Sequence, residues 1–239
     1  MNWTVKIAVL VLASCTLASC GSAVNNVSET NDLAALNDNV TQSGKLILDG
    51  SEKVVIEAKK TPVEYVNFIK NATHLHRTKT IAGVDYRLSY LPTEYMVCNE
   101  LKSNEISKAE FIKALEGFVG TEYYMLQIEV PGTVTELAKV NLTYQQQYQE
   151  RIAYLSFGMQ SDIKAISDDG TEVFCNVYHF ERTYNATPYS TFIIGFPDDE
   201  LEHAKERTIA LEDKLFNNGL IKFNWSTDQL KVIPQITLL

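Results

Sequence analysis

The sequence predicts a single α+β domain, in which a mostly antiparallel sheet carries two or three helices packed on it. Short β-rich runs are joined by Asp-Gly and Asn-Gly turn signals, which are typical of antiparallel hairpins. Two segments begin with helix capping boxes. After residue 44 neither an internal repeat nor a linker divides the chain, so residues 44–239 are expected to form one domain.

The first part of this domain alternates strand and helix signals. A hairpin is predicted over residues 46–56, around an Asp-Gly-Ser turn. A helix is predicted from Pro62, because Thr61 and Glu64 form a capping box and proline suits the first helical turn. Residues 84–90 alternate apolar and polar side chains, which predicts a strand with one buried face.

The next segment contains one ambiguous and two clear elements. Residues 94–101 fit either a short helix or a strand. A second capping box, from Ser107 to Glu110, starts a helix for which Gly120 is the expected C-cap. Residues 121–130 then predict a strand that ends at a Pro-Gly pair.

The middle of the domain combines a third helix with further strands. Apolar side chains at helical spacing predict a helix over residues 144–155. Residues 163–167 and 172–184 are joined by an Asp-Asp-Gly turn and read as a hairpin. Because the second arm is apolar on both faces, it is expected to be a central strand. Residues 190–196 predict one more strand.

The C-terminal part leaves two alternatives open. Residues 198–216 fit a helix, but they also fit a loop followed by a hairpin around the Asn-Asn-Gly turn. In that turn Gly219 is expected at positive φ. The tail over residues 230–239 is apolar and predicts a last strand interrupted by Pro234.

Composition narrows the classes of function. Apolar residues make up 45% of the chain and the formal net charge is −9. The apolar fraction indicates a packed core. The negative charge disfavours nucleic acid and anionic membrane surfaces as partners, because an acidic surface repels phosphate groups.

The N-terminus has the layout of a secretory signal. The basic residue Lys6 precedes an apolar run from Ile7 to Leu17. This run is about half of the ~20 residues that a membrane-spanning helix needs, so cleavage is expected. It ends in Leu-Ala-Ser-Cys at residues 17–20, which resembles the lipobox of bacterial lipoprotein precursors.

The resemblance is confined to residues 1–21 and implies a membrane anchor. It implies that the signal peptide over residues 1–19 is removed and that Cys20 is acylated by fatty acids such as palmitate. With Gly21 as the next residue, it implies sorting to the outer membrane, facing either the periplasm or the outside. The polar stretch over residues 20–43 is expected to be a flexible tether with a reach of about 25–30 Å.

Two other interpretations of this region stay open. Residues 12–15 form a second lipobox-like sequence, which would leave a short signal core, and an ordinary secretory cleavage would leave Cys20 unmodified. Seven Asn-x-Ser/Thr sequons would suit a secreted glycoprotein, but one of them, at Asn224, falls within a predicted strand.

Few residues indicate a disulfide, a metal site or a catalytic site. Cys98 and Cys175 either form a disulfide in an oxidising compartment or stay as buried thiols. His74 and His76 are spaced for zinc on a strand but lack a further ligand nearby, so exposed loop histidines are expected. His179 is expected to be a satisfied core residue.

The sequence therefore assigns no catalytic, cofactor-binding or metal-ligating residue. Neither a Gly-x-Ser-x-Gly elbow nor a phosphate-binding glycine loop is present. Two hypotheses follow. In the first, a lipid-anchored envelope protein binds a protein or glycan partner or forms part of an envelope assembly. In the second, the protein is a lipid-anchored hydrolase of cell-wall or polysaccharide material. A deep pocket with convergent acids would favour the hydrolase, and a shallow aromatic patch the binder.

Cys20→Ser tests the anchor. We expect the substitution to abolish labelling by a radioactive fatty acid and to leave an uncleaved precursor or a released protein. Label that persists in Cys20→Ser, or that is absent from the wild type, would contradict acylation at Cys20.

Overall fold

The computed structural model describes residues 59–133, 135–184 and 186–239. Cys20, the predicted tether over residues 20–43 and the predicted hairpin over residues 46–56 lie outside these residues. Within them the predicted α+β fold is confirmed, with five helices and two antiparallel sheets. No helix in the described part of the chain has the length and apolar character that a membrane span requires.

The strands form one sheet of five and one of four. The larger sheet has the order β1 (His76–Ile81), β2 (Val84–Leu91), β3 (Thr121–Glu129), β7 (Tyr189–Pro197), β6 (Val177–Glu181). The smaller sheet has the order β5 (Glu172–Phe174), β4 (Ile163–Ser167), β8 (Glu206–Asp213), β9 (Gly219–Ser226).

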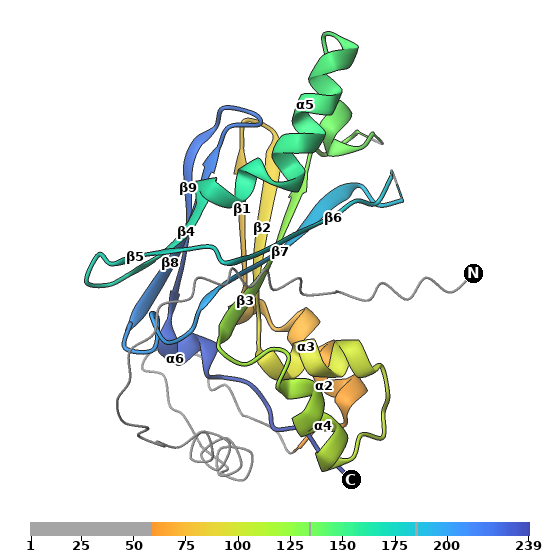
Figure 1. The fold of residues 1–239 in the computed structure, drawn as a ribbon, viewed down its shortest axis with the longest axis vertical. Helices are drawn as coiled ribbons and strands as arrows, with labels where there is room; N and C mark the ends of the chain where they lie inside the picture. Colours follow the sequence, from red (N-terminus) through yellow and green to blue (C-terminus); the bar gives the residue numbers. More distant parts are fainter. Residues whose placement is uncertain (1–58, 134, 185) are drawn as a thin grey trace, which may run out of the picture. The chain divides into compact units, whose positions relative to one another are not determined.

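The helices gather at two ends of the domain (Figure 1). Three of them lie together at one end: α2 (Pro62–Asn71), α3 (Thr93–Leu101) and α4 (Lys108–Leu115). The helix at the other end, α5 (Gln145–Ser156), extends beyond the neighbouring strands. A short helix, α6 (Thr227–Leu230), follows β9.

Both predicted capping boxes are present. Thr61 accepts a hydrogen bond from the backbone of Glu64, whose carboxylate accepts one in return. Ser107 and Glu110 repeat this arrangement at the start of α4. The expected C-cap is wrong, because α4 ends at Leu115 and Gly120, at φ +81°, instead leads the chain into β3.

The prediction of one central strand over residues 172–184 is wrong. The chain changes sheet between β5 and β6, where the backbone N–H of Asn176 donates to the carbonyl of Gly195 on β7. Each half is therefore an edge strand of a different sheet, and Phe174 is 69% exposed. Apolar side chains on both faces reflect this exchange between sheets rather than burial on both faces.

Residues 206–226 form the hairpin alternative, β8 followed by β9. Gly219 has φ +75°, as the turn predicted. The buried carboxylate of Asp213 accepts hydrogen bonds from the backbone of Leu215, Phe216 and Asn218 and from the hydroxyl of Tyr86. This carboxylate therefore fixes the hairpin turn to the larger sheet.

Residues 94–101 form part of helix α3, so the helix is the correct alternative for that segment.

The predicted last strand over residues 230–239 is wrong. Helix α6 opens the tail, and Ile236 makes only an isolated bridge to Lys60. Pro234 limits pairing there, because proline lacks the N–H that a ladder needs.

The two sheets share one hydrophobic core. Tyr124 on β3 contacts Trp225 on β9 with ring centroids 5.6 Å apart, and both side chains are fully buried. Further aromatic side chains that are buried in this core are Tyr86, Phe192, Phe196 and Phe223.

An ion pair crosses this core. The Nε atom of Arg207 on β8 lies 2.8 Å from Oε2 of Glu122 on β3, and both side chains are less than one tenth exposed. The hydroxyl of Tyr124 donates to the same carboxylate. Arg207 also donates to the backbone carbonyls of Leu201 and Ala204. Burial raises the pKa of Glu122, against the opposing effects of Arg207 and Tyr124.

Removal of one partner of this ion pair should destabilise the folded protein. We expect Arg207→Met to lower the free energy of unfolding by about 3–5 kcal/mol, because Glu122 is left buried without its cation. The double variant Arg207→Met with Glu122→Gln should recover part of this loss, since the amide is neutral and still accepts from Tyr124. Urea unfolding measures both effects. A double variant less stable than Arg207→Met would contradict this account.

Candidate functional site

The two cysteines do not form a disulfide. Cys98 on α3 and Cys175 after β5 are both buried free thiols. Burial raises the pKa of Cys98 to about 12 and that of Cys175 to about 11. Both groups therefore stay protonated and unreactive near neutral pH.

The expectation of exposed histidines at positions 74 and 76 is wrong. Both are half-buried, and His74 bonds to the carbonyl of Val232 while His76 bonds to Ser89 and to the carbonyl of Ile69. Burial lowers the pKa of each. His179 is exposed on β6, contrary to the expected core position. Among the described residues no group of three or more His, Cys, Asp or Glu side chains is placed to hold a metal ion.

A different group of residues gathers around the N-terminal end of α5. The 3₁₀ helix η2 (Leu137–Lys139) precedes α5, and Arg151 on α5 donates to the carbonyl of Val140, which ties the two together. Arg182 directly follows β6, and its Nε atom lies 2.7 Å from Oε1 of Glu136. Tertiary contact thus assembles residues that are far apart in the sequence.

Tyr148 on α5 completes this cluster. Its hydroxyl donates to Oε2 of Glu136 over 3.0 Å and accepts a hydrogen bond from Arg182. The Glu136 side chain is only 3% exposed. Burial opposes its ionisation, but the hydrogen bonds from Arg182 and Tyr148 prevail and lower its pKa. Glu136 is therefore a buried carboxylate that holds the site together.

Aromatic rings and cations alternate at this site. Lys139 Nζ lies 5.5 Å from the ring centroid of Tyr148, and the Arg182 guanidinium lies 5.7 Å from the same centroid. Arg182 also lies 4.3 Å from the ring centroid of Tyr184, which is 69% exposed. All three distances are in the range of cation–π contacts.

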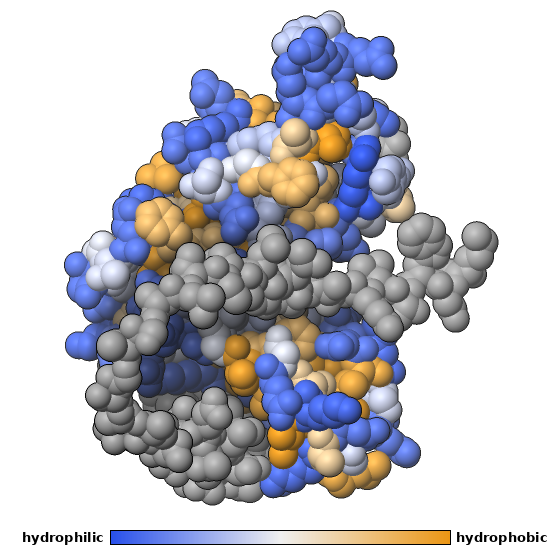
Figure 2. Space-filling view, in the orientation of Figure 1, coloured by the Kyte–Doolittle hydropathy of each residue, from blue (hydrophilic) through white to orange (hydrophobic). Residues whose placement is uncertain are grey.

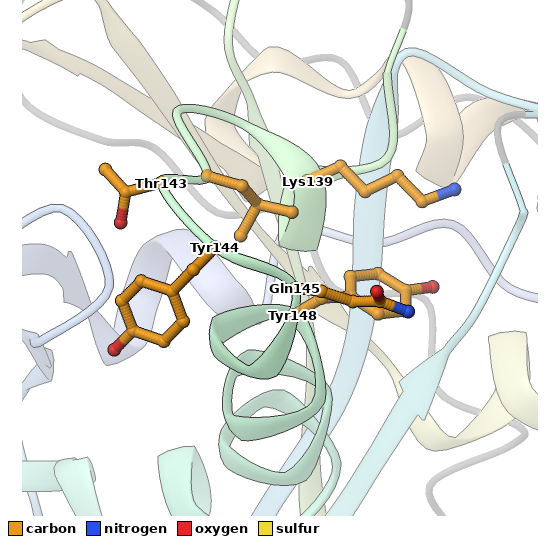
Figure 3. A pocket seen from close by; sticks show the side chains of 6 residues that line it. Lys139, Thr143, Tyr144, Gln145 and Tyr148 are labelled. Atoms are coloured by element: carbon orange, nitrogen blue, oxygen red, sulfur yellow. The ribbon is translucent and has the colours of Figure 1, made fainter.

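An open pocket of about 430 Å³ lies beside this cluster. It is lined by Lys139, Leu142, Thr143, Tyr144, Gln145 and Tyr148. In Figure 3 the polar ends of Lys139 and Gln145 and the Tyr148 hydroxyl point to the same side, while Thr143 and Tyr144 point to the other. Among these lining residues Lys139 carries a charge and none is acidic.

The surface around the pocket is polar. Figure 2 shows the outer end of α5 as mostly hydrophilic, whereas apolar side chains gather farther down this face. Tyr144 is 57% exposed within the pocket. The site therefore offers aromatic rings in polar surroundings.

Two carboxyl groups with raised pKa values lie elsewhere in the domain. Burial raises the pKa of Glu94 on α3 and of Glu122 on β3, and both groups act electrostatically on the hydroxyl of Tyr90. Neither is among the residues that line the pocket at α5, and Glu122 is bound to Arg207 and Tyr124.

Comparison with known protein families, with curated proteins and with solved structures finds no match to this chain. The chemistry of the α5 site is therefore inferred from its own residues.

Sequence reasoning missed this site. The helix over residues 144–155 was predicted, but its tyrosines were assigned to the apolar side of the helix. The closest signal in the sequence is the pair Tyr144 and Tyr148 at a spacing of one helical turn, beside glutamines. Glu136 and Arg182 carry no local signal, because only the tertiary fold joins them.

Glu136→Gln tests the charge of the central carboxylate. At pH 7 we expect it to lower the free energy of unfolding by about 1–3 kcal/mol, because the bonds from Arg182 and Tyr148 lose their charged acceptor. The pKa of Glu136 is lower in the folded than in the unfolded protein, so its contribution is complete above about pH 4.3 and is lost as the pH falls through the folded value. The difference in melting temperature between the wild type and Glu136→Gln should therefore shrink as the pH is lowered from 7 to 3. A constant difference would contradict an ionised Glu136.

Proposed function

We propose that this chain is a lipid-anchored protein of the cell envelope whose α+β domain binds a glycan at the α5 site. The observation that supports this most is the pocket itself, in which two tyrosines, an amide, a hydroxyl and a cation line an open surface without an acidic residue. This is the shallow aromatic patch that favours a binding protein over an enzyme.

The side chains that line the pocket suit the binding of a sugar. A sugar ring has an apolar face that packs on an aromatic ring, and hydroxyls around its edge that need hydrogen-bond partners. Tyr144 offers an exposed ring with the Thr143 hydroxyl on the same side, and Gln145 offers a donor and an acceptor on the other side of the pocket. The polar surroundings in Figure 2 favour a hydrated glycan over an apolar protein partner.

The proposed anchor rests on the lipobox resemblance at residues 17–20. An acidic chain with formal charge −9 gains little from anionic head groups, so acylation of Cys20 would supply the attachment. The tether over residues 20–43 would let the domain reach glycans above the membrane surface.

The second hypothesis, a hydrolase, is supported by one observation. Glu94 and Glu122 are carboxyl groups with raised pKa values, a property of acids in glycoside hydrolases. Their position away from the lining of the pocket makes hydrolysis the less favoured proposal.

Binding to isolated envelope polysaccharide tests the proposal. We expect the purified protein to be retained by immobilised cell-wall and capsular glycans, and Tyr144→Ala to reduce retention about tenfold through loss of the stacking surface. Phe174→Ala is the matched control, because it removes an aromatic ring of similar exposure on β5, away from the pocket. Equal losses in both variants would contradict a site at α5. Release of shorter sugars during the assay would instead support the hydrolase.

A further inference from the structure

The charges at the α5 site do not balance. Glu136 lies 2.7 Å from Arg182 Nε and 3.6 Å from Lys139 Nζ, so one carboxylate faces two cations. Arg182 makes the shorter contact and also bonds to Tyr148. Glu136 therefore faces a second cation, Lys139, which brings a positive charge to the pocket of a chain whose net charge is −9.

Lys139 is the cation that a ligand can reach. Its side chain is 43% exposed and lines the pocket, whereas Arg182 is 28% exposed and its guanidinium is held by Glu136 and by the rings of Tyr148 and Tyr184. The flexible ammonium of a lysine can move toward a ligand oxygen, since its contact to Glu136 is long.

We infer that the glycan carries carboxylate groups, as uronic acids do. Lys139 recognises the carboxylate of one sugar unit, while Tyr144, which points to the other side of the pocket, packs on the ring of another unit of the same glycan. This inference rests on the proposed function. The carboxylate supplies the negative charge that balances the site, and the charge-assisted bond to Lys139 favours acidic over neutral sugars. Glu136 and Arg182 are positioning residues, because they hold Tyr148 and η2 in place.

The test compares two probes that differ in one substituent of each ring, which is a carboxylate in one and a hydroxymethyl group in the other. One is an oligosaccharide of galacturonic acid, and the other is its carboxyl-reduced form, which has the same rings without carboxylates. Calorimetry at low ionic strength should show about tenfold tighter binding of the acidic probe. Raising the salt concentration should weaken this preference, because the contact is partly exposed.

Three variants assign the preference to one side chain. Lys139→Met should abolish the preference for the acidic over the neutral probe, and Lys139→Arg should retain it. Lys222→Met removes one exposed lysine from β9 and controls for the loss of net charge. Melting temperatures check that each variant is folded.

The outcomes separate the two proposals. Equal binding of both probes, abolished by Tyr144→Ala, would overturn the acidic-sugar inference and leave glycan binding intact. Binding of neither probe, while neutral envelope glycans still bind, would also overturn it. Failure of every glycan to bind would overturn the proposed function itself. Tighter binding of an oligoglutamate peptide than of the acidic sugar would show that the partner is an acidic protein.

Discussion

The contact between Arg207 and Glu122 is the constraint on which the arrangement of the two sheets depends. It joins β8 to β3 near the first residues of both strands, and Arg207 also holds the loop before β8 through the carbonyls of Leu201 and Ala204. A buried guanidinium needs several acceptors at once, so the loop, both strands and the carboxylate have to reach their final positions together. Apolar packing alone would allow the sheets to slide over one another more freely.

The same three side-chain types recur near the surface. Arg182, Glu136 and Tyr148 repeat the guanidinium, carboxylate and phenol of the buried cluster. Burial dominates at Glu122 and raises its pKa, whereas hydrogen bonds dominate at Glu136 and lower its pKa. Both carboxylates are buried, so their partners rather than their exposure separate the cluster that fixes the core from the cluster beside the open pocket.

Local chemistry explains which elements could be predicted from the sequence. The capping boxes and the Asn-Asn-Gly turn act within a few residues, and all three are present. The prediction of one strand over residues 172–184 is wrong, because an apolar pattern does not show where a chain leaves one sheet for another. The α5 site was missed for a related reason, since Glu136 and Arg182 are separated by 46 residues and meet only in the folded domain.

A shallow pocket and a lipid anchor complement each other in the proposed function. An open site that buries little of its ligand binds weakly by itself, because the loss of translational freedom offsets most of the contact energy. An anchor at Cys20 would confine the domain to a thin layer beside the membrane, where envelope glycans are concentrated. Repeated acidic sugars along one chain would then present many equivalent sites to the domain, and a tether of about 25–30 Å would let it rebind before diffusing away. Modest affinity at Lys139 and Tyr144 would therefore be sufficient for stable association with an acidic polysaccharide layer.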